Sequence, residues 1–131
     1  IPAEAIVYGR LPLMITENCL VQNETGCRLD RQGPCVPEDG PCRCGQPNVL
    51  VDRTGAAFPL LPAYGHRTEI QNSKPLYLAD RPEHRRLGLA YARLRFTTET
   101  AEECVSVVQN YLDAAPAAGD FTRGLYERGV E

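Results

Sequence analysis

The chain lacks the features that mark several protein classes. Basic residues are not in excess, since 14 Lys and Arg stand against 17 Asp and Glu, for a net charge of -3. A nucleic-acid-binding module usually carries a basic face, so this charge argues against that class of partner. No apolar run approaches the roughly 18 residues that a membrane-spanning helix needs. Because the first 16 residues also lack the charged start and the cleavage site of a signal peptide, we expect a soluble, cytoplasmic protein.

Familiar catalytic motifs are also missing. Ser73 and Ser106 are the only serines, and neither lies in a Gly-x-Ser-x-Gly turn. A cysteine nucleophile needs a histidine beside it, and the chain offers only His66 and His84, the latter in the charged stretch PEHRR. There is no glycine-rich loop of the kind that binds phosphate. The residues alone therefore assign no catalytic centre.

What is present suits a single α+β domain over residues 1–131. A chain of this length can bury roughly two thirds of its unfolded surface, so it needs no staple to fold. Short segments rich in β-branched and aromatic residues predict strands at 4–9 and 11–16. Two apolar runs, NVLVD and AAFPLLP, flank Arg53-Thr54-Gly55 and predict a β-hairpin, and another strand is expected at 67–73.

The second half then predicts a β-α-β-α order. Asp80 as a cap and Gly88 as a stop bound a short helix, and residues 89–96 alternate as a strand. Thr100 and Glu103 form a capping box before a helix over about 101–113. Apolar residues recur at helical spacing on one face of it, namely Cys104, Val105, Val108, Tyr111 and Leu112. The order strand, helix, strand suits a parallel pair joined by a right-handed crossover.

The segment GCRLDRQGPCVPEDGPCRCG, residues 26–45, concentrates four of the six cysteines among proline, glycine and charge. Such a segment cannot build its own core. Its thiols, with Cys19 and His66 from outside it, could hold a tetrahedral metal. They could instead form disulfides, with 15 possible pairings of six cysteines, which the lack of an export signal disfavours. Free thiols that pack as small apolar groups are the third alternative, and the one we prefer for Cys104.

Five stretches carry a resemblance to a known family. They are VYGRLPLMITENCLVQN, LVDRTGAAFPLL, IQNSKPLYLAD, LRFTTETAEE and FTRGLYERGV. In this order they resemble the peptidase family U32, the collagenase-like putative proteases of bacteria and archaea. The resemblance covers nearly the whole chain and is interrupted chiefly by residues 28–43, which we interpret as an insertion.

The resemblance implies a fold and an activity. The core domain of the family is similar to a TIM-type barrel, and these motifs belong to its later portion. Because the chain also begins without Met inside an expected strand, we expect it to be a fragment of a longer protein. Hydrolysis of peptide or collagen-like substrates would belong to that parent, and the fragment alone would be inactive. The family has no agreed catalytic residues to carry over. A barrel fragment exposes strand edges, so homo-oligomers are also expected.

Other branches of the family assist hydroxylation of RNA or of ubiquinone precursors with an iron-sulfur cluster on four cysteines. Of those positions Cys19 matches, whereas Pro12 stands at the first and Pro75, Leu76 and Tyr77 stand near another. Two of the four ligands are missing, so we do not expect this cluster. An accessory or substrate-binding domain of an RNA- or cofactor-modifying relative remains the alternative function.

The branch with the YGRLPLM form has cysteines that correspond to Cys19, Cys27 and Cys44, and His66 stands where a further cysteine would be. Zinc accepts either side chain. The resemblance therefore implies zinc on these four residues, and a fully protein-ligated site is structural. Two cysteines of the insertion are alternates, Cys35 and Cys42.

Several polar residues lie within the matching motifs. They are Arg10, Glu17, Asp52, Arg53, Asn72, Arg95 and Arg123. In a barrel they could line the mouth, where active sites lie. We expect instead that most of them form ion pairs or cap turns.

Overall fold

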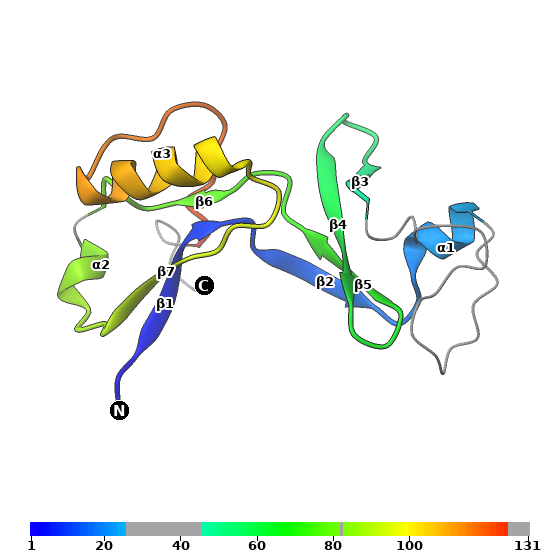
Figure 1. Ribbon diagram of the computed structural model, residues 1–131, viewed down its shortest axis with the longest axis horizontal. Coiled ribbons are helices and arrows are strands. Elements are labelled where there is room, and N and C mark those ends of the chain that lie inside the picture. The colour runs from blue at the N-terminus through cyan, green and yellow to red at the C-terminus, as the bar shows by residue number, and fades with distance from the viewer. Residues whose placement is uncertain (26–45, 82, 126–131) are drawn as a thin grey trace. The chain divides into compact units, whose positions relative to one another are not determined.

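The fold is α+β, as expected. The computed structural model describes residues 1–25, 46–81 and 83–125, which form seven strands and three helical segments. They group into two compact units, Ile1–Leu11 with Lys74–Glu131 (unit 1) and Pro12–Ser73 (unit 2) (Figure 1). Along the sequence, unit 2 is therefore an excursion within unit 1. None of the helices in the described ranges has the length and apolarity that crossing a membrane requires.

Unit 1 is built on a three-stranded mixed sheet with the order β6-β1-β7. The strands are β1 (Glu4–Gly9), β6 (Leu76–Tyr77) and β7 (Tyr91–Leu94). β1 runs parallel to β7 and antiparallel to β6. The helix α3 (Ala101–Leu112) lies along this sheet (Figure 1), and its Val107 packs in one core cluster with residues of β1 and β6. The short helix α2 (Glu83–Arg86) precedes β7.

Unit 2 is built on a four-stranded antiparallel sheet with the order β2-β5-β4-β3. Its strands are β2 (Pro12–Thr16), β3 (Asn48–Val51), β4 (Ala57–Ala63) and β5 (Arg67–Gln71). The helix α1 (Leu20–Thr25) covers part of one face. Its Val21 packs with Leu60 and Ile70 in the buried cluster of this unit.

Most of the predicted elements are confirmed. The two strands expected within the first sixteen residues form as β1 and β2, and the β3–β4 hairpin and β5 also form. The capping box of α3 is also present, because the Glu103 N–H donates to Thr100 Oγ1 over 3.3 Å and the Thr100 N–H donates to Glu103 Oε2 over 2.7 Å. Two short elements, α1 and β6, were not predicted.

Three finer predictions are wrong. The strand expected at 67–73 pairs in the antiparallel sheet of unit 2, so it forms no parallel pair with β7, whose parallel partner is β1. The short helix begins at Glu83, and Asp80 does not cap it. On α3, Val105 and Leu112 are 71% and 72% exposed. The apolar stripe of this helix is therefore wider than the strip that packs on the sheet.

Candidate functional site

The two predicted metal ligands that the structure describes lie at the same end of the unit 2 sheet. At this end β2 finishes and β5 begins, with Thr16 paired to Thr68. Cys19 follows β2 after two residues, and His66 directly precedes β5. The antiparallel pairing thus brings a thiol and an imidazole to the same end of the sheet, although they are far apart in sequence.

Polar contacts fix the backbone on both sides of Cys19. The Leu20 N–H donates to Thr68 Oγ1 over 3.0 Å, which ties the start of α1 to β5. The Arg67 guanidinium forms an exposed ion pair with Glu17 at 3.2 Å. Exposed pairs contribute little stability, but this one joins Arg67, next to His66, to Glu17, two residues before Cys19.

His66 occupies an unusual backbone conformation. In the turn between β4 and β5, Gly65 has φ 74° and His66 has φ 57°. Left-handed backbone costs a residue with a Cβ roughly 1–2 kcal/mol, although histidine is among the residues enriched there. A partly buried histidine thus stands at a position where a second glycine would adopt the same backbone conformation without this cost.

The other predicted ligands, Cys27 and Cys44, and the alternates Cys35 and Cys42 lie outside the described residues. Within the described ranges no three His, Cys, Asp or Glu side chains come together as a metal site. Cys19 is a free, partly buried thiol. A thiol and an imidazole are donors that suit zinc, so the described half of the predicted site has the right chemistry.

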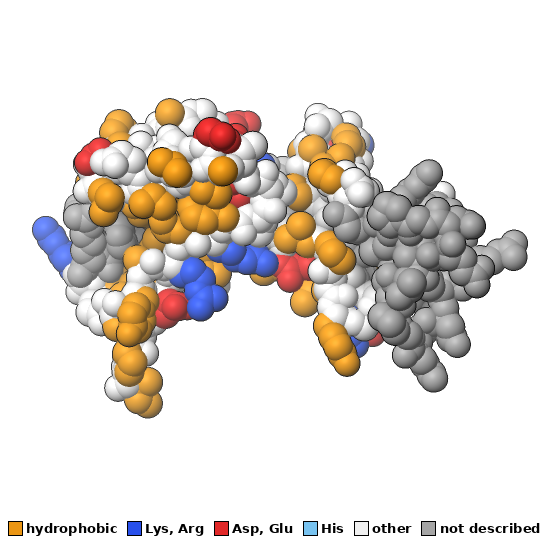
Figure 2. All heavy atoms as spheres, viewed as in Figure 1, with side chains coloured by type: hydrophobic (Ala, Val, Ile, Leu, Met, Phe, Trp, Pro, Cys, Tyr) orange, Lys and Arg blue, Asp and Glu red, His pale blue; other side chains and the backbone are white. Residues whose placement is uncertain are grey.

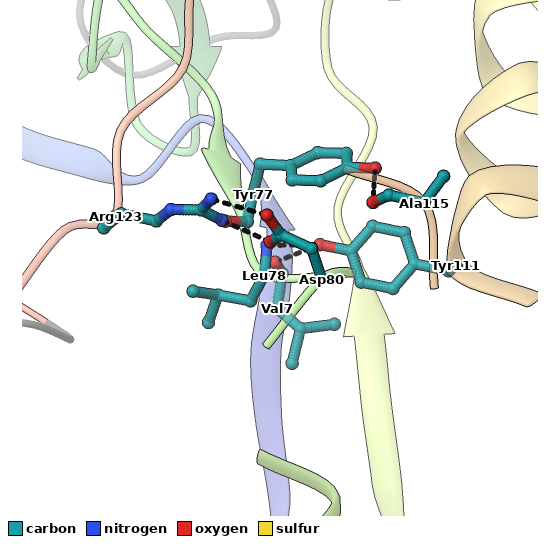
Figure 3. A network of polar contacts seen from close by, with 7 residues as sticks. All are labelled: Val7, Tyr77, Leu78, Asp80, Tyr111, Ala115 and Arg123. Atoms are coloured by element: carbon teal, nitrogen blue, oxygen red, sulfur yellow. Dashed lines mark hydrogen bonds and ion pairs between the residues drawn. The ribbon is translucent and has the colours of Figure 1, made fainter. Parts of the chain in front are cut away.

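The best-defined polar network lies in unit 1 and centres on the ion pair between Asp80 and Arg123 (Figure 3). The guanidinium donates to both carboxylate oxygens, over 2.7 and 2.8 Å, and to the Tyr77 carbonyl over 2.6 Å. Hydrogen bonds from Arg123 hold the pKa of Asp80 below its usual value. The Phe121 ring lies 4.5 Å from the guanidinium carbon. This network ties the C-terminal segment to the residues that follow β6.

The Tyr111 hydroxyl bridges β1 and the residue that follows β6, at the point where the ladder between β1 and β6 ends (Figure 3). It donates to the Val7 carbonyl over 2.5 Å and accepts from the Leu78 N–H over 2.8 Å. The register of Tyr8 opposite Tyr77 makes Val7 and Leu78 the next pair, so the hydroxyl stands where a direct backbone bond would form. Burial is the main cause that raises the pKa of Tyr111 to about 12, so the hydroxyl keeps its proton.

Gly9 is required where β1 ends. Its φ is +119°, and a Cβ there would lie 2.0 Å from the Arg95 carbonyl oxygen. No side chain can be accommodated against a backbone atom at that distance. Arg95 is held on the other side, because its Nη1 donates to the Arg10 carbonyl over 2.8 Å. The close approach fixes how the chain leaves β1 and β7.

A solvent-open hollow of about 420 Å³ lies in unit 1, beside the residues that follow β1 and β7. The Glu99 carboxylate on its wall accepts from the Tyr8 hydroxyl over 3.2 Å and from the Thr97 N–H over 2.7 Å. Burial, and next the charge of Glu99, raise the pKa of Tyr8, so the phenol remains a donor. These contacts hold the connection between β7 and α3 in place.

Three of the seven motif polar residues form ion pairs or cap a turn, as expected. Asp52 Oδ1 accepts from the Thr54 and Ala56 N–H groups, which closes the β3–β4 turn. Arg123 forms the ion pair of unit 1 and Glu17 that of unit 2. These three residues therefore have structural partners, and their roles are those of turn caps and ion pairs.

Sequence reasoning missed Asp80 and Tyr111 as network residues. Tyr111 carried a usable signal, because a tyrosine on the apolar face of a helix needs a partner for its hydroxyl. Asp80 carried none, since its partner lies 43 residues away.

Comparisons with protein-family models, with curated proteins and with solved structures find no match for this chain.

Proposed function

We propose that this chain is part of a U32-type putative peptidase, with peptide-bond hydrolysis residing in the parent protein. The observation that carries the proposal is the run of five motifs in the family's order over nearly the whole chain. No nucleophile is assigned to it.

The structural roles of the motif residues support this proposal. Gly9 in the first motif is required by its close approach to a carbonyl, and Asp52 in the second closes a hairpin. Asp80 in the third pairs with Arg123 in the last. These roles depend on the residue type at each position, so a chain that makes the same contacts would place the same residues at these spacings. The motifs are thus the part of the sequence by which a common fold is most readily identified.

The later portion of a TIM-type barrel would contribute parallel strands followed by helices. Within unit 1, β1 and β7 are parallel neighbours and α3 follows β7, which is compatible with that origin. The antiparallel partner β6 on the other side of β1 departs from an all-parallel barrel. A barrel would therefore have to continue from the open side of β7.

Unit 2 would carry a structural zinc site formed by Cys19, Cys27, Cys44 and His66. The support from the described residues is that Cys19 and His66 lie at one end of the same sheet. Zinc on these side chains would tie the segment 26–45 to this end and would contribute folding free energy directly. A site with four protein ligands keeps no open position, so it would have no catalytic role.

Metal content tests the site. The purified chain should hold one zinc per molecule by elemental analysis, and Cys44→Ser should lose it whereas Cys35→Ser should not. The reverse pattern would move the ligand to Cys35. If the purified protein is instead brown, absorbs visible light and contains iron, the metal is an iron-sulfur cluster and not zinc. This result would favour the RNA- or cofactor-modifying alternative.

Degradation assays test the activity. The parent protein should degrade gelatin, and the 131-residue chain alone should not. A parent that is folded and loaded with metal yet leaves gelatin and other unfolded peptides intact would contradict the peptidase proposal. Zinc content and gelatin degradation are separate results, so one can fail while the other stands.

A further inference from the structure

We propose that the outer edge of β3 pairs with β3 of a second copy of this chain, antiparallel, so that two unit 2 sheets join into one. The inference does not depend on the proposed peptidase function. It follows from which backbone groups of β3 are already used within the sheet, and from how this edge differs from the edge at β2. Figure 2 shows exposed apolar side chains at the β3–β4 hairpin.

Within the described part of the chain, the backbone groups of β3 that no neighbouring strand uses belong to Val49 and Val51. The Asp52 N–H donates to the Ala56 carbonyl over 3.0 Å, so Asp52 faces β4. Backbone direction alternates along a strand, which turns Leu50 toward β4 and leaves Val49 and Val51 facing outward. Pro59 is consistent with this assignment. It lies opposite Val49, and proline has no N–H, so at this pair β4 donates no hydrogen bond to β3.

Among the described strands, β3 is an edge without the usual protection. Its register with β4 is regular over four residue pairs, and the strand carries no charge. Val49, Leu50 and Val51 are 56%, 46% and 57% exposed. The other edge, β2, begins with Pro12 and has a register irregularity directly after it. Proline and bulges are devices that block pairing with another chain, and β3 has neither.

The outward groups of β3 are self-complementary. In an antiparallel pair with Val49 opposite Val51 of the second copy, both residues exchange N–H and carbonyl bonds, and the two-fold axis repeats the pair. Leu50 then meets Leu50 of the second copy. Asn48 lies opposite Asp52 of the second copy, an amide against a carboxylate, so no like charges meet. An extended strand is the occupant that these unpaired backbone groups require.

The chain also limits the length of this ladder. Pro47 precedes β3 and has no N–H to donate, so pairing ends there. Four backbone bonds and three apolar side chains per copy make a small interface. Small interfaces belong to weak complexes, so we expect a dissociation constant on the order of 10–1,000 μM.

Sedimentation equilibrium of the full 131-residue chain, over about 5–500 μM and with a reductant to prevent disulfides, measures this dimer. Val49→Lys should weaken it at least about tenfold, because a lysine on an edge strand disfavours pairing. The matched control is Leu13→Lys on β2, at a site that is 54% exposed, and it should leave the dissociation constant unchanged. Circular dichroism of both variants verifies that they remain folded.

Amide hydrogen exchange identifies the surface. As the protein concentration rises, exchange of the Val49 and Val51 N–H groups should slow, whereas that of Leu50, already bonded to β4, should not change. A chain that is monomeric throughout the concentration range would overturn the inference. So would a dimer that Leu13→Lys dissociates and Val49→Lys does not, or one that leaves the Val49 and Val51 amides exchanging as in the monomer.

Discussion

Removal of the Tyr111 hydroxyl, as Tyr111→Phe, tests whether a side chain completes the ladder between β1 and β6. The hydroxyl contacts two backbone groups in the core of unit 1, the Val7 carbonyl and the Leu78 N–H. Val7 is 1% exposed and Leu78 is 6% exposed, so water cannot readily replace the lost oxygen. The phenylalanine ring keeps the packing against Tyr8 and Tyr77.

The expected loss follows from these two groups. A buried donor or acceptor left without a partner costs about 1–3 kcal/mol, so with two such groups the free energy of unfolding should fall by about 2–6 kcal/mol. For a unit of this size, each kcal/mol lowers the melting temperature by roughly 4–8 °C. Tyr91→Phe is the matched control, because its ring is 63% exposed on β7. It should change the free energy of unfolding by less than about 0.5 kcal/mol.

Urea unfolding followed by circular dichroism measures both variants. A raised pKa in the folded state stabilises the protein below the unfolded pKa of about 10, and this stabilisation is lost as pH rises through the folded value. The difference between wild type and Tyr111→Phe should therefore shrink between pH 10 and the folded pKa of about 12. A loss below about 0.5 kcal/mol at pH 7 would mean that Leu78 bonds Val7 directly once the hydroxyl is gone, and would refute the bridging role.

Two further changes test unit 1 by urea unfolding. Arg123→Lys should cost about 1–2 kcal/mol, since an amine cannot make the paired bonds of a guanidinium to Asp80. The lowered pKa of Asp80 gives stability that is present above its unfolded pKa and is lost as pH falls through the folded value. The cost of Arg123→Lys should thus shrink between pH 5 and pH 2, and a constant cost would exclude the ion pair as its cause. Gly9→Ala should cost more than about 3 kcal/mol because of the 2.0 Å approach, whereas Gly55→Ala, with open space around it, should cost only about 1–2 kcal/mol. Equal costs would argue against the close approach.

The elements that could be predicted are those specified by neighbouring residues. The β3–β4 hairpin follows from a short turn with Gly55, and α3 follows from its capping box. β6 has two residues and no local signal, and its partners come from distant parts of the sequence. The same limit applies to strand pairing, because local order gives the sequence of elements but not the sheet to which each belongs. For the candidate zinc site, the family resemblance implied the four ligands, whereas the placement of Cys19 and His66 at one end of the sheet depends on the register of β2 and β5.

The size of unit 2 gives a physical reason for the zinc site that we propose. The expectation that 131 residues need no staple assumes that they share one core. The described residues instead form separate clusters, and that of unit 2 has three buried members, Val21, Leu60 and Ile70. The described residues of unit 2 therefore bury little apolar surface, and small units with little apolar burial commonly depend on a metal or disulfides. Zinc beside Cys19 would add to this cluster directly, because the thiol already packs against it. Loss of the metal should therefore destabilise unit 2 and leave the Tyr111 and Arg123 contacts of unit 1 intact.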